Sequence, residues 1–118
     1  CMFGALRAGY TVVNCNPLYT PRELEHQLAD SGADVIVIME NFAATLAEVI
    51  GRLPLKHVVV TSMGEMLGGM KGALVNLVVR HVKKLVPAFH LPQAVSLKSV
   101  LARGAGAELR KVPIGHDD

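Results

Sequence analysis

Three short apolar runs, evenly spaced along the chain, constrain its fold more than any other feature. They begin at Thr11, Asp34 and His57, so 23 residues separate each start from the next (34 − 11 and 57 − 34). Each run is short and rich in Val, Ile or Thr, which is typical of buried strands. Each interval has room for one helix, and strands joined by helices form right-handed crossovers in a parallel sheet. The sequence therefore predicts an α/β fold with a parallel three-stranded βαβαβ sheet and flanking helices. The run from Asp34 to Met39 is continuously apolar after its first residue, which favours a strand covered on both faces.

A helix start is encoded most clearly at Thr20. Thr20 is followed by Pro21 at the first helical position and by Glu23 three residues after the cap, the pattern of a capping box. The predicted helix ends at Gly32, and its apolar positions Leu24 and Leu28 face inward.

Two more helices are expected in the first half. Residues 2–8 form one that stops at Gly9. Asn41 is positioned to cap the other, which Pro54 stops, and its apolar residues recur on one face: Phe42, Leu46, Val49, Ile50 and Leu53. With the three strands, at residues 11–15, 34–39 and 57–61, these helices make residues 1–66 a βαβαβ half-sheet unit.

The second half has a different pattern. Residues 67–104 read as a basic amphipathic helical segment, with a long helix from Met70 to Val86 and a short one over 96–103. Apolar side chains cover one arc of the long helix, Arg80, Lys83 and Lys84 the other, and His81 falls inside the apolar arc. His81 is either a core histidine bonded to the backbone or a polar group lining a lipid-facing groove. Residues 105–118 read as an exposed connector.

Charge is distributed unevenly. Residues 1–70 hold four Lys/Arg and seven Asp/Glu, a net −3, whereas residues 71–118 hold eight and three, a net +5. No acidic residue lies between Glu65 and Glu108. Two interpretations stay open: the long helix covers the sheet with its basic face in water, or it lies on an anionic membrane through Arg80, Lys83 and Lys84.

Composition narrows the function classes. Aromatic residues make up 4% of the chain and Trp is absent, which argues against a base-stacking nucleic-acid module. The two cysteines, Cys1 and Cys15, have no metal or redox spacing, so a reduced, cytoplasmic compartment fits best.

No residue pattern in the chain specifies a catalytic, cofactor-binding or metal site. Gly64 and Gly69 have the gap of a phosphate loop, but Met70 comes next, Lys71 is one position late and Gly72 has no hydroxyl. The five histidines show no metal-ligand spacing.

A resemblance to a known family adds to these predictions. The run over residues 4–28, continued by 30–33 and 56–61, resembles adenylate-forming (acyl-activating) enzymes. Residues 71–87 are similar to the fatty-acid–CoA ligase branch of that family, and residues 112–118 resemble the approach to its phosphate loop. The resemblance covers essentially the whole chain.

The resemblance implies a partial subdomain from the N-terminal domain of such an enzyme. The parent would use ATP and Mg²⁺ to convert a fatty acid to an acyl-adenylate, and CoA would then displace AMP. The family's phosphate loop, magnesium-site glutamate, nucleotide contacts, hinge and C-terminal lysine have no counterpart here, so no catalytic residue is carried over. The expected location is the cytoplasm or the inner face of the membrane. The alternative is a stand-alone, non-enzymatic α/β interaction or peripheral membrane module.

Overall fold

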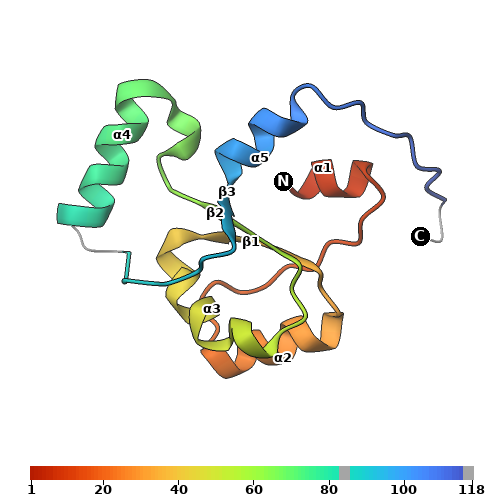
Figure 1. Ribbon diagram of the computed structural model, residues 1–118, viewed down its shortest axis with the longest axis horizontal. Helices are drawn as coiled ribbons and strands as arrows, with labels where there is room; N and C mark the ends of the chain where they lie inside the picture. Colours follow the sequence, from red (N-terminus) through yellow and green to blue (C-terminus); the bar gives the residue numbers. More distant parts are fainter. Residues whose placement is uncertain (83–85, 116–118) are drawn as a thin grey trace.

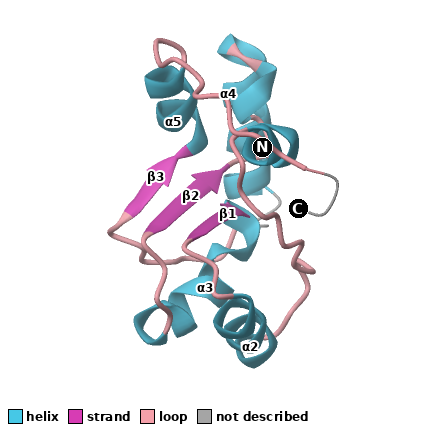
Figure 2. Ribbon diagram, turned by 90° about the vertical axis from the view of Figure 1, so that its right-hand side faces the viewer, coloured by secondary structure: helices cyan, strands magenta, loops and turns pink. Residues whose placement is uncertain are grey.

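A parallel sheet lies at the centre of the molecule. The structure, a computed structural model, describes residues 1–82 and 86–115. The strands β1 (Val35–Met39), β2 (His57–Thr61) and β3 (Ala94–Ser96) lie in the order β1-β2-β3 and run in the same direction (Figure 2). Figure 1 shows α2 (Pro21–Ser31) and α3 (Ala43–Val49) below the strands. Above them are α1 (Met2–Arg7), α4 (Gly69–Leu77) and α5 (Leu97–Gly104). The predicted fold class is confirmed.

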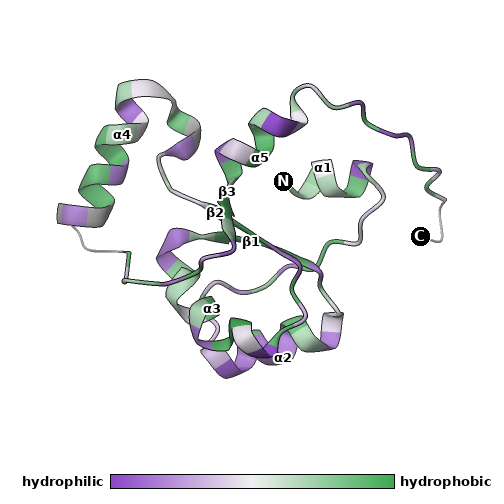
Figure 3. Ribbon diagram, in the orientation of Figure 1, coloured by the Kyte–Doolittle hydropathy of each residue, from purple (hydrophilic) through white to green (hydrophobic). Residues whose placement is uncertain are grey.

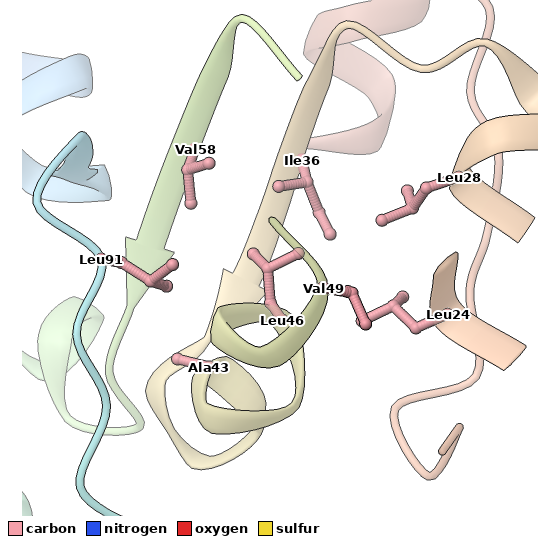
Figure 4. Packing of buried hydrophobic residues seen from close by; sticks show 8 residues of the cluster. All are labelled: Leu24, Leu28, Ile36, Ala43, Leu46, Val49, Val58 and Leu91. Carbon is pink, nitrogen blue, oxygen red and sulfur yellow. The ribbon is translucent and has the colours of Figure 1, made fainter. Parts of the chain in front are cut away.

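The core lies between α2, α3 and one face of the sheet. Ile36 and Val58 are partners in the register and therefore share that face. Leu46, Val49 and Val58 are fully buried. Figure 4 shows the eight residues of this cluster: Leu24, Leu28, Ile36, Ala43, Leu46, Val49, Val58 and Leu91. The inward orientation predicted for Leu24 and Leu28 is confirmed.

The opposite face of β1 is bare. Val35 and Val37 alternate with the buried Ile36 and are exposed. The prediction that β1 is covered on both faces is therefore wrong for this chain. A continuous apolar run shows that a strand can be covered on both sides, but another part of the chain must supply the cover.

The strand predicted over residues 11–15 does not form, and the third strand is β3. β-propensity describes how well side chains fit a pleated, half-buried surface and says nothing about which edge accepts the strand. β3 pairs with β2 through Val58 and Ala94, although the sequence predicted no strand there. Its three residues are too few to show alternation.

The capping box of α2 is confirmed. The Glu23 backbone N–H donates to Thr20 Oγ1 at 3.4 Å, and the Thr20 N–H donates to Glu23 Oε2 at 2.8 Å. Gly32 ends the helix with φ 62°, in the left-handed region that glycine enters easily. An ion pair of 2.8 Å between Glu25 and Arg52 joins α2 to the short 3₁₀ helix η2 (Ile50–Arg52).

The helical region after β1 is less regular than predicted. A 3₁₀ turn, η1 (Glu40–Phe42), precedes α3, and η2 follows it. Phe42 is the N-cap of α3 and Asn41 lies inside η1, so the predicted cap by Asn41 is wrong. The burial of Leu46 and Val49 confirms the predicted apolar face.

The second half contains the predicted helices and the unpredicted β3. α4 continues into a π-helical turn, η4 (Val78–Val82), and the predicted residues 83–85 lie outside the described part. α5 confirms the short helix over 96–103, with Ser96 as its N-cap. Residues 105–115 are exposed and form no helix or strand, and Val112 packs beside Gly9. The division at residues 66 and 104 stays a prediction.

Candidate functional site

A small cavity lies where the three parallel strands end. Ligands of open α/β sheets bind outside the carboxyl ends of the strands, so this edge is the first place to look for a site. The cavity has a volume of about 190 Å³. It is lined by Glu40, Val60, Thr61, Ser62, Glu65, Phe89, Ala94, Val95 and Ser96. Small-molecule pockets usually have about 300–1,000 Å³, so this one is too small for a nucleotide.

Glu65 joins the elements around the cavity. It lies in the 3₁₀ turn η3 (Glu65–Leu67), just beyond β2. Its Oε1 accepts the Lys98 backbone N–H at 2.9 Å, and its Oε2 accepts the Ser62 N–H at 3.3 Å. Burial acts to raise the pKa of Glu65, but hydrogen bonds from the Thr61 side chain and from the Lys98 and Ser62 amides outweigh it and lower the pKa. Glu65 therefore holds the loop after β2 against the N-terminus of α5 as a carboxylate.

Replacing Glu65 by glutamine should make the chain less stable at pH 7 by about 1 kcal/mol, because a charge-assisted acceptor is lost. Since folding lowers the pKa of Glu65 below its ordinary value of 4.5, its contribution is complete above that pH and is lost as the pH falls below it. Urea unfolding at pH 7, 5 and 3.5 should show the wild-type advantage shrinking with acid. Glu48→Gln, at an exposed position on α3, is the control. An advantage for wild type that is equal at every pH would contradict this role.

The second carboxyl group at the cavity belongs to Glu40. This residue follows β1 directly and is only 3% exposed. Hydroxyl groups of Thr61, Ser62 and Ser96 complete the polar part of the lining. The lining thus offers carboxylate and hydroxyl oxygen atoms that can accept hydrogen bonds.

The glycine-rich loop after β2 packs against α4. The Gly64 N–H donates to Asn76 Oδ1 at 2.8 Å, and Gly64 and Gly72 are in backbone contact. A phosphate loop needs its amides free for the ligand. The Gly64 amide is instead bonded to the Asn76 side chain.

The structure locates the candidate membrane residues incompletely. Arg80 lies in η4, where the structure describes its backbone. Lys83 and Lys84 lie outside the described residues. His81 is exposed, so the interpretation as a core histidine is wrong. The side of α4 and η4 that carries Gly72 and Val79 packs inward, because a glycine lets the helix come close to the backbone of Gly64. His81 lies on the opposite side and is therefore exposed. The lipid-facing interpretation of His81 stays a prediction.

Glu40 and Glu65 were not singled out from the sequence. The available signal was their position, since each comes within a few residues of the end of a predicted strand. The partners of Glu65 could not be predicted, because Lys98 is 33 residues away and lies beside an unpredicted strand.

Neither a metal centre nor a membrane span is found in the described ranges. Among side chains of residues 1–82 and 86–115, His, Cys, Asp and Glu do not gather in threes around a point that could hold an ion. No helix in these ranges has the length and apolar character needed to cross a bilayer.

Comparison with known proteins defines the family. The family described as AMP-binding enzyme matches residues 1–75, more than half of the 118-residue chain. The chain belongs to the AMP-binding enzyme family. The resemblance to adenylate-forming enzymes predicted from the sequence is confirmed.

Individual relatives extend the match beyond the AMP-binding family range. The long-chain-fatty-acid–CoA ligase of Yersinia pestis is 52% identical over 117 residues, covering 99% of this chain and 21% of the relative. The protein of the same name from Escherichia coli O157:H7 is 58% identical over 103 residues, covering 87% and 18%. The Bacillus subtilis one is 50% identical over 38 residues, covering 32% and 7%. The chain spans about a fifth of the length of the first two relatives. No solved structure matches significantly.

Proposed function

We propose that this chain is part of a fatty-acid–CoA ligase. The observation that carries the proposal is the identity of 51–58% to proteins named long-chain-fatty-acid–CoA ligase, over 87–99% of the chain. In the proposed reaction, a fatty-acid carboxylate oxygen attacks the α-phosphorus of ATP, and pyrophosphate leaves. The thiolate of CoA then attacks the acyl carbon, a carbon–sulfur bond forms and AMP leaves. The first step is needed because a carboxylate is a poor acyl donor until its oxygen becomes part of a good leaving group.

The contribution of these residues to that reaction is structural. The cavity of about 190 Å³ does not fit a nucleotide. The carboxylate of Glu65 is already held by backbone amides, and the described side chains do not form a magnesium site. The cavity at the ends of the strands therefore does not fit ATP or Mg²⁺, and we expect other parts of the ligase to bind both. This chain supplies the sheet and the layer of α2 and α3 below it.

Fatty-acid-dependent exchange of pyrophosphate into ATP tests the proposal. A complete ligase that carries these residues should catalyse the exchange, and the purified 118-residue piece should give none above background. Adding oleate, ATP and Mg²⁺ together or singly separates fatty-acid-dependent exchange from contaminating activity. Exchange by the piece alone would overturn the structural role, and no exchange by the complete protein would overturn the ligase assignment.

We also propose that the ligase works in the cytoplasm and at the inner face of the membrane. Support comes from the acid-free stretch between Glu65 and Glu108, which contains Arg80, Lys83 and Lys84. Each basic residue near an anionic leaflet adds about 1 kcal/mol of attraction. A long-chain fatty acid partitions into bilayers, so an enzyme that uses it benefits from working there.

A further inference from the structure

A close contact between Gly9 and Val112 joins two segments that are far apart in the sequence. A Cβ atom placed on Gly9 would lie 2.8, 3.2 and 3.3 Å from Val112 Cγ1, Cβ and Cγ2. The Val112 side chain therefore occupies the space in which every residue other than glycine carries its Cβ atom. We call this open side of Gly9 the Gly9 notch. Figure 3 shows α1 largely in the green of hydrophobic residues, with the connector, described over residues 105–115, on the side of its C-terminal end.

The turn that carries the Gly9 notch is set by local hydrogen bonds. The Gly9 N–H donates to the Leu6 carbonyl at 3.0 Å, and the Tyr10 N–H donates to the Ala5 carbonyl at 3.0 Å. These two bonds form a Schellman motif at the end of α1, and Gly9 has the left-handed φ, 81°, that the motif requires. The Gly9 notch therefore forms without help from Val112.

Val112 holds the connector against this turn. Within the described part of the chain, no backbone hydrogen bond joins residues 108–114 to another element. The Val112 Cβ and both of its methyl carbons face the Gly9 notch, so rotation of the side chain does not relieve the contact. Pro113 follows and restricts its own backbone and that of Val112. The position of Val112 therefore sets the direction in which the connector continues.

We infer that Gly9 and Val112 are positioning residues of the proposed ligase, which hold its ATP-binding part in place; this inference rests on the proposed function. The cavity at the ends of the strands is too small for a nucleotide, so the proposed reaction needs a nucleotide site in another part of the ligase. Residues 112–118, which resemble the approach to the family's phosphate loop, begin at this contact. A misplacement of about 1 Å far from the chemistry can lower a rate about 100-fold. A displaced Val112 should therefore impair the use of ATP.

Pyrophosphate exchange by a complete ligase that carries these residues tests the inference. Gly9→Ala places a methyl group in the Gly9 notch and displaces the connector, so we expect the KM for ATP to rise about fivefold or more. Val112→Ala alone leaves the notch empty and should raise this KM about threefold, so the test stands even if Gly9→Ala does not fold. In the double variant the new methyl group occupies the space of the lost ones, and the KM should return to within about twofold of wild type.

Gly32→Ala is the matched control for Gly9→Ala. Gly32 also has a left-handed φ, 62°, but an added Cβ there meets nothing within 4 Å. The control therefore carries the same kind of backbone strain without the overlap, and its KM for ATP should stay within about twofold of wild type. Loss of stability alone lowers the amount of active ligase and leaves KM unchanged, so a rise in KM separates positioning from a merely structural role.

Trypsin measures the contact independently of activity. Arg110 and Lys111 are exposed and directly precede Val112, so cleavage after them should be about tenfold faster in Gly9→Ala than in wild type or Gly32→Ala. No exchange by the wild type would reject the proposed function and with it the positioning role, while the trypsin rates would still show whether the contact holds the connector. An unchanged KM for ATP in Gly9→Ala, an equal rise in Gly32→Ala, or equal trypsin rates would each overturn the inference.

Discussion

Replacing Leu46 by alanine should unfold the isolated 118-residue chain at 25 °C. Leu46 is fully buried in the cluster between α3, α2 and the sheet. Leu→Ala changes at such sites cost about 2–5 kcal/mol, the lost transfer energy plus that of the cavity left behind. Typical domains have a free energy of unfolding of about 5–15 kcal/mol, and we expect this chain at the lower end of that range because it leaves one face of β1 uncovered. The expected result is the loss of a cooperative melt by circular dichroism.

Leu18→Ala is the matched control for Leu46→Ala. It removes the same atoms from a side chain that is 79% exposed, so the melting temperature should shift by no more than the equivalent of about 0.5 kcal/mol. If the two variants melted alike, the buried cluster described here would not be the core that stabilises the chain.

Replacing Gly72 by alanine should release α4 from the molecule. A methyl group at this position would overlap the Gly64 backbone carbonyl, and a backbone atom cannot rotate away as a flexible side chain can. We expect a loss of about 1–3 kcal/mol from overpacking, together with rapid proteolysis within residues 62–78. The direction of the change in stability is informative, because alanine stabilises the interior of a helix by about 1 kcal/mol relative to glycine when it meets no steric clash.

Gly104→Ala provides the matched comparison for Gly72→Ala. Gly104 is the last residue of α5, and an added methyl group there meets nothing within 4 Å. The change should therefore be neutral or slightly stabilising in thermal unfolding. An equally neutral Gly72→Ala, with α4 still protected from protease, would contradict the close contact.

Local chemistry made α2 fully predictable. Thr20, Pro21, Glu23 and Gly32 each have a role that depends on neighbours within a few residues, so the sequence contains all the information. The buried face of α3 was predictable for the same reason. The strand at residues 11–15 and the cover of β1 depend on which distant segment occupies a sheet edge or face, and no local pattern carries that information.

The candidate site was less predictable than the fold, because its contacts join distant residues. Glu65 acts through Lys98, 33 residues away, and Gly64 through Asn76, 12 residues away. The periodicity of the long helix identified an apolar arc but could not show that the Gly72 side would pack inward. The proposal that Lys83 and Lys84 contact a membrane rests on the charge pattern of the sequence, because both residues lie outside the described part of the chain.

The bare face of β1 has a consequence for synthesis of the proposed ligase. A ligase of the relatives' length is about five times as long as this chain, and ribosomes add about 5–20 residues per second. If the covering segment follows this chain in the ligase, the valines of that face, Val35 and Val37, stay in water for many seconds after α2 and α3 have closed the other side. A nascent chain in that condition is a natural client for a chaperone at the ribosome exit, so the yield of active enzyme should depend on translation speed as well as on final stability.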